Sequence, residues 1–160
     1  MLFFFSGLNA QKLDKYYTSS SGDQGTLYYV NLEDEFKQVN GPASLIYDLS
    51  VLSSKDSCYL NFSLYSPTLY RIDSLKIVYD STAILLPVKK LFIDTDKDWH
   101  HRYSTRVPKV LLAEMYRYEQ SPEFTFFTDE KELSLTQKAR KWRKTSELGS
   151  RIFDLIAYNE

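Results

Sequence analysis

The sequence predicts a mainly β protein: an antiparallel sandwich or a partly open barrel, with one short helix and a C-terminal helix packed on the sheet. Apolar and polar residues alternate with a period of two in several short segments, which is typical of strands that bury one face. Helical periodicity is confined to two segments late in the chain, so strands and helices do not alternate as they do around a parallel sheet. The 13 Tyr and 10 Phe agree with this class, because aromatic residues favour strands.

The clearest local pattern is a β-hairpin between residues 44 and 65. Apolar side chains occupy every second position of both arms, apart from Ile46 and Leu52, and the polar residues 53–57 connect the arms. This pattern predicts two antiparallel strands that share one buried face. The apolar positions of the hairpin are Leu45, Tyr47, Leu49, Val51, Cys58, Leu60, Phe62 and Leu64.

Other segments predict shorter strands and two helices. The strands are expected at residues 26–30, 75–79, 82–86, 88–93, 99–107, 123–128 and 131–135. Pro108 fits the first position of a short helix, where its missing N–H costs nothing. A second helix is expected from about Thr136 to Tyr158, with Trp142 and Phe153 on its apolar stripe. Gly149 lies in that stripe and indicates either a close approach to the sheet or a break in the helix.

The first eleven residues indicate export. A short apolar run, residues 2–8, ends in Asn9-Ala10-Gln11, and a small residue such as Ala10 is typical of the position before a signal-peptidase cut. The run is too short to cross a bilayer, which takes roughly 20 apolar residues. No Lys or Arg precedes it, so we expect a signal peptide with a truncated basic region. A buried N-terminal strand is the alternative.

We therefore expect a signal peptide at residues 1–10, a mobile segment at 11–25 and a single β-rich domain with its C-terminal helix at 26–160. The expected location is the periplasm, the cell envelope or the extracellular space, without a transmembrane segment. The ending Leu8-Asn9-Ala10-Gln11, followed by a chain rich in Tyr, Asp and Ser, resembles small exported proteins of Bacteroidetes bacteria. The resemblance implies export and maturation at the Ala-Gln junction, and it implies no activity.

Metal sites were sought among the acidic and histidine residues. Asp94, Asp96 and Asp98 place three carboxylates at alternate positions, as at the start of an EF-hand calcium loop. However, Trp99 stands where that loop needs Gly, and Thr105 stands where it needs a bidentate Glu. A solvated turn is the favoured interpretation, with these carboxylates as weak metal candidates. We expect no bound metal and no cofactor.

Nothing in the sequence marks a catalytic residue. His100 and His101 are adjacent, so in a strand they point to opposite faces and cannot bind one metal together. Cys58 lies on the apolar side of its strand, where a buried thiol is inert. The chain also lacks a Gly-x-Ser-x-Gly turn and a glycine-rich phosphate loop. These observations make an enzyme less favoured, and a hydrolase is the least favoured alternative.

The distribution of charged residues indicates which classes of partner to expect. The net charge of −1 does not supply the broad positive field of a nucleic-acid-binding domain, so no nucleic-acid partner is expected. The basic run at residues 138–144 fits the solvated face of an amphipathic helix, with contact to anionic headgroups or acidic glycans as the alternative.

The leading hypothesis is an exported non-catalytic module that binds a protein, a glycan or an envelope surface. Its candidate binding residues lie on the polar sides of their strands: Tyr59, Tyr65, Arg102 and Arg106. A carrier of a small apolar ligand is the alternative, because antiparallel strands followed by a C-terminal helix loosely resemble lipocalins. The Gly-x-Trp of that family near the first strand is absent, since both Trp residues come late. The oligomeric state stays open.

Overall fold

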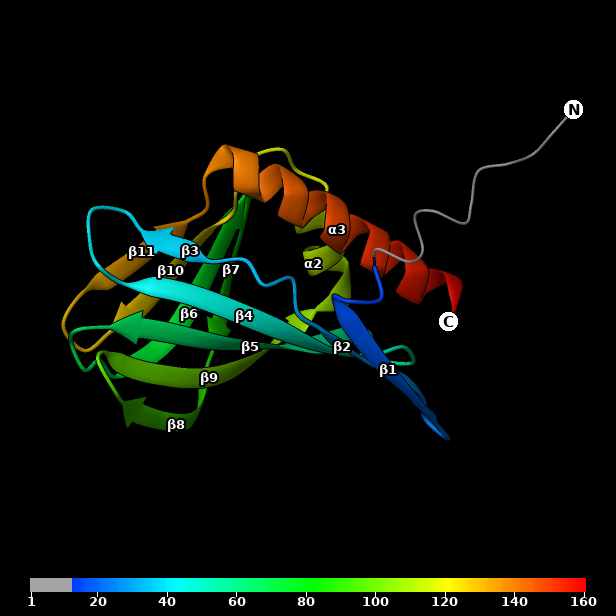
Figure 1. The fold of residues 1–160 in the computed structure, drawn as a ribbon, viewed down its shortest axis with the longest axis horizontal. Coiled ribbons are helices and arrows are strands. Elements are labelled where there is room, and N and C mark those ends of the chain that lie inside the picture. Colours follow the sequence, from blue (N-terminus) through cyan, green and yellow to red (C-terminus); the bar gives the residue numbers. More distant parts are fainter. Residues whose placement is uncertain (1–12) are drawn as a thin grey trace, which may run out of the picture.

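One antiparallel sheet curls into a nearly closed barrel in the computed structural model, which describes residues 13–160 (Figure 1). Two helices lie against this sheet, which confirms the predicted fold class. The elements are β1 (Tyr17–Gly22), β2 (Gly25–Val30), β3 (Phe36–Gln38), β4 (Ser44–Leu52), β5 (Ser57–Ser66), β6 (Ile72–Tyr79), β7 (Thr82–Pro87), β8 (Lys89–Thr95), β9 (Trp99–Pro108), α2 (Lys109–Met115), β10 (Glu123–Thr128), β11 (Glu132–Thr136) and α3 (Ala139–Tyr158).

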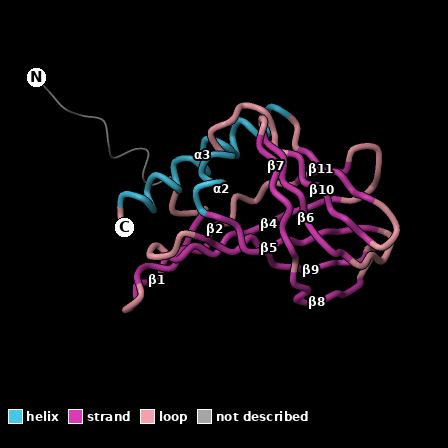
Figure 2. The backbone as a smooth tube through the Cα atoms, turned by 180° about the vertical axis from the view of Figure 1, so that it is seen from behind, coloured by secondary structure: helices cyan, strands magenta, loops and turns pink. Residues whose placement is uncertain are grey.

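The strand order explains how the sheet closes. Neighbouring strands follow the order β7-β6-β10-β11-β3-β4-β5-β9-β8, and the hairpin of β1 and β2 is joined through β2 to the second half of β4. The two end strands, β7 and β8, are consecutive in the chain and are separated by Val88 alone. Thr105 on β9 donates a hydrogen bond of 2.7 Å to the carbonyl of Pro87, which ties this junction to the far end of the sheet. Figure 2 shows the resulting barrel from behind.

The barrel interior is filled by the inward side chains of the predicted hairpin and its neighbours. In β4 and β5, Leu45 lies opposite Leu64 and Tyr47 opposite Phe62, so the alternating apolar residues meet on one face. Phe62 also packs against Phe126, with ring centroids 4.8 Å apart. Each of these side chains is buried, which places the core inside the curled sheet.

Helix α3 crosses one side of the barrel and packs on α2 (Figure 1). Trp142 is fully buried, and its ring stacks on Tyr116 at 5.8 Å. A Cβ added to Gly149 would lie 2.4 Å from the ring of Tyr116, so Gly149 lets the helix approach that ring. The helix continues unbroken through Gly149, so a break there is wrong, and the close approach is to Tyr116 at the end of α2 rather than to the sheet.

Three expectations need correction. The segment expected to be mobile, residues 11–25, contains β1 and the start of β2 within its described part. Strand β1 was missed because its side chains are mostly exposed and polar, so backbone pairing with β2 rather than an apolar face defines it. The three-residue strand β3 is too short to show periodicity. Helix α3 begins at Ala139 rather than 136, because Thr136 still pairs with Lys37 in the sheet.

The expected signal peptide lies outside the described residues and stays a prediction. Within residues 13–160, neither helix combines the length and the apolar character needed to span a membrane.

Replacing Gly149 with alanine tests the packing of α3. Gly→Ala inside a helix ordinarily stabilises by roughly 0.5–1 kcal/mol. Here the added Cβ meets a buried ring, so we expect the free energy of unfolding to fall by about 1–3 kcal/mol in urea denaturation. Gly22→Ala is the control, because a Cβ at that position meets nothing within 4 Å. A Gly149→Ala variant as stable as the wild type would contradict this packing.

Candidate functional site

The outward side of strands β2, β4, β5, β9 and β8 carries the best-organised polar surface in the described chain. We call it the outer sheet face. Its side chains include Tyr29, Ile46, Asp48, Ser50, Tyr59, Asn61, Ser63, Tyr65, Lys89, Phe92, Asp94, His100, Arg102, Ser104 and Arg106. Because side chains alternate along a strand, the apolar inward residues that build the core also direct these residues outward.

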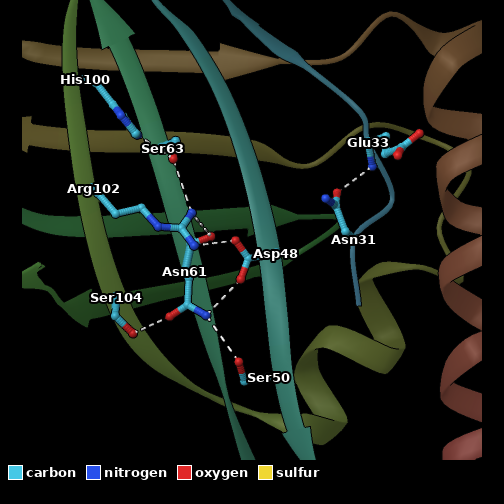
Figure 3. A network of polar contacts seen from close by, with 9 residues as sticks. All are labelled: Asn31, Glu33, Asp48, Ser50, Asn61, Ser63, His100, Arg102 and Ser104. Carbon is cyan, nitrogen blue, oxygen red and sulfur yellow. Dashed lines mark hydrogen bonds and ion pairs between the residues drawn. The ribbon is translucent and has the colours of Figure 1, made fainter. Parts of the chain in front are cut away.

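Arg102 is the centre of a hydrogen-bond network on this face (Figure 3). Its guanidinium donates to Asp48 Oδ2 at 2.5 Å, to Ser63 Oγ at 3.2 Å and to the carbonyl of Asn61 at 3.3 Å. The ring of His100 shares a bond of 2.8 Å with Ser63 Oγ. One cation is thereby held in a fixed orientation by groups from two neighbouring strands, β4 and β5.

Asn61 joins the rest of the network to this centre. Its side-chain amide donates to Asp48 Oδ1 at 3.0 Å and to Ser50 Oγ at 3.3 Å, and its carbonyl oxygen accepts from Ser104 at 2.8 Å. Asp48, Asn61 and Ser104 are direct cross-strand neighbours, so strand register alone brings them together.

The network orients side chains more than it stabilises the fold. The side chains of Arg102 and Asp48 are 21% and 33% exposed, so water screens their attraction. Pairs of this kind contribute at most about 1 kcal/mol. Burial, together with the nearby Arg102, lowers the pKa of His100, so this ring is neutral at pH 7. Asp48 balances the charge of Arg102, while Arg106 and Lys89, which lies opposite Ser104, are further cations on this side of the sheet.

Aromatic rings flank the network at both ends. Tyr29 and Tyr59 are 52% and 54% exposed, and both lie beside Ser50 in one cross-strand row. At the other end, Tyr65 stacks on His100 with ring centroids 4.6 Å apart, and Phe92 meets the same imidazole edge-on at 5.1 Å. A polar centre therefore lies between two aromatic borders.

The structure brings all four sequence-predicted binding residues onto this one face. Tyr59 lies opposite Arg106, Tyr65 opposite His100, and Arg102 opposite Ser63. The sequence did not identify the other members of the network. Their signal was their place on the polar side of alternating segments, but that pattern does not show which residues of different strands meet. These members are Asp48, Ser50, Asn61, Ser63 and Ser104.

The weak metal candidates do not form a site. Asp94, Asp96 and Asp98 are exposed around the turn between β8 and β9, where Asp94 Oδ1 accepts a bond from the amide of Thr95. Across residues 13–160, no three His, Cys, Asp or Glu side chains are placed to hold a metal ion. Cys58 is buried on the inward face, and burial raises the pKa of its thiol to about 12. At neutral pH this thiol is therefore protonated and unreactive.

The two histidines point to opposite faces, as the sequence predicts. His101 is fully buried, and its Nδ1 lies 3.1 Å from the carbonyl of Leu64 while its Nε2 accepts a bond of 2.9 Å from the amide of Tyr70. Because a carbonyl can only accept, Nδ1 carries the hydrogen and the ring is neutral. His101 thus fixes the chain just before β6.

Among known proteins, no family model, no curated protein and no solved structure matches this chain.

His101 predicts a pH dependence of stability. Burial lowers its pKa below the ordinary value of 6.5, so below that pH the unfolded chain binds a proton that the folded chain does not. Stability is complete above this value and falls as the pH drops through it, by up to about 1.4 kcal/mol per pH unit. Urea denaturation at about pH 7.5 and about pH 5.5 measures the loss.

His100 supplies the control, since its pKa is also lowered. We expect the His100→Gln variant to retain the acid-induced loss of stability that His101 causes, and we expect the His101→Asn variant to lack it. An unchanged loss in His101→Asn would show that the proton binds elsewhere.

Proposed function

We propose that the protein is an exported, non-catalytic module that binds a glycan on the outer sheet face. The observation that carries the proposal is the combination of exposed tyrosines with a pre-oriented network of donors and acceptors. A sugar ring offers C–H groups on its face and hydroxyls around its edge. Aromatic rings pack against the C–H face of the sugar, and fixed carboxylate, amide and guanidinium groups form hydrogen bonds with its hydroxyls.

The arrangement favours a glycan over a protein partner. Protein interfaces place apolar residues at the centre and polar residues at the rim. The outer sheet face has the reverse order, with Arg102, Asp48 and Asn61 at its centre and Tyr59 and Tyr65 near its borders. A protein or an envelope surface is thus the less supported partner.

The non-catalytic part of the proposal rests on the charges of this surface. Glycoside hydrolysis ordinarily uses two carboxyl groups that flank the scissile bond. Within the described strands, the hydrogen-bonded network around Arg102 contains one carboxylate, Asp48, and both of its oxygens accept hydrogen bonds. A second carboxylate, Asp94, lies opposite His100 on β8 but accepts its bond from the amide of Thr95. The export part rests on residues 2–11, whose pattern is that of a signal peptide.

A lipocalin-like carrier has less support, because it needs an apolar cavity inside the barrel. Inward aromatic side chains occupy that interior. The ring centroids of Phe36 and Phe124 are 4.9 Å apart, and those of Phe62 and Phe126 are 4.8 Å apart. All four rings are fully buried.

Tyr59→Ala tests the proposal on an array of neutral and acidic oligosaccharides. The wild type should bind a subset of the neutral oligosaccharides, and Tyr59→Ala should weaken that binding by about tenfold, because an exposed stacking platform is lost. Tyr158→Ala is the matched control, since Tyr158 is 90% exposed at the end of α3, away from the network. Equal losses in both variants, or an array without any bound glycan, would overturn the proposal.

A further inference from the structure

A second candidate site lies at one end of the barrel and faces the inner side of the sheet. It is a cavity of about 540 Å³ formed beside β8 and β9, the start of β6 and the turn between β10 and β11. Its apolar walls come from Leu69, Ile72, Val88 and Ile93. The volume lies within the range of roughly 300–1,000 Å³ that is typical of small-molecule sites.

Tyr103 supplies a buried hydroxyl in this cavity. Its side chain is only 3% exposed, and its ring stacks almost parallel on Phe62 at 5.7 Å. The hydroxyl oxygen accepts a long bond of 3.5 Å from the amide of Ile72. Within residues 13–160, no group accepts the hydrogen of this hydroxyl in return. The cavity therefore contains a fixed donor that lacks an acceptor.

Lys90 supplies a cation next to this donor. It lies directly opposite Tyr103 in the pairing of β8 and β9, so both side chains start from the same face of the sheet. Lys90 has no ion pair with any residue in the described part of the chain. A ligand with an anionic acceptor would satisfy both Lys90 and Tyr103.

The other charged side chains of the cavity are Arg71, Asp73 and Asp129. Arg71 Nε lies 3.9 Å from Asp73 Oδ1, and Asp129 Oδ1 accepts a bond of 3.0 Å from the amide of Arg71. The amide of Asp129 in turn donates to the carbonyl of Arg71 at 3.0 Å. These contacts hold the two loops together. Asp73 offsets the charge of Arg71, and Lys90 is the other cation of the cavity lining.

We propose that this cavity binds a small carboxylic acid with an apolar body. The carboxylate accepts hydrogen bonds from Tyr103 and Lys90, and the body packs on Leu69, Ile72, Val88 and Ile93. No covalent step is involved. The site is separate from the outer sheet face, so its failure would leave the glycan proposal untouched.

Isothermal titration calorimetry with octanoate tests this site, with 1-octanol as the uncharged probe of the same chain length. Lys90→Gln and Tyr103→Phe should each weaken octanoate binding by about fivefold or more, and 1-octanol should bind at least about tenfold more weakly than octanoate. Lys89→Gln is the matched control, because Lys89 lies opposite Ser104 and belongs to the other side of the sheet. Urea denaturation confirms that the variants are folded.

Any of three results would overturn the proposal. One is an absence of saturable octanoate binding by the wild-type protein. The second is equal affinity for octanoate and 1-octanol, and the third is an equal effect of Lys90→Gln and Lys89→Gln, because binding would then not depend on the cation in the cavity.

Discussion

The pairing of β5 with β9 is the constraint on which the rest of the molecule depends. Ten consecutive residue pairs join the two strands, from Ser57 with Pro108 to Ser66 with Trp99. This register turns Phe62 and Tyr103 inward as a stacked pair and turns Ser63 and Arg102 outward. A slip of one residue would exchange the faces, since side chains alternate along a strand. The polar network and the barrel-end cavity therefore lie on opposite faces of the same strand pair.

Local patterns predicted the parts of the fold that bury one face of a long strand. The hairpin of β4 and β5 and the strand β9 were visible because their apolar residues recur at every second position. Strands β1 and β3 were not visible, since the first is exposed and polar and the second has three residues. The role of Gly149 could not be settled from sequence, because Tyr116, the ring that it contacts, belongs to another element.

The sequence predicts which face of the sheet the candidate residues occupy, but it does not predict which residues contact one another there. Alternation alone showed that Tyr59, Tyr65, Arg102 and Arg106 point away from the core. The contacts that organise the surface join residues far apart in the chain: Arg102 binds Asp48 across 54 positions and Ser63 across 39. Such pairs follow from strand order and register, which periodicity does not contain. The same limit explains why the cavity beside Tyr103 left no signal in the sequence.

Binding of a glycan by the outer sheet face is the property on which the proposed function depends. An amide NMR titration of the wild-type protein with its most tightly bound oligosaccharide tests this most directly. We expect saturable shifts that are largest in the central segments of β4, β5 and β9, around Asp48, Asn61 and Arg102. Shifts confined to α3 or to the cavity beside Tyr103 would contradict the proposal that the outer sheet face binds a glycan.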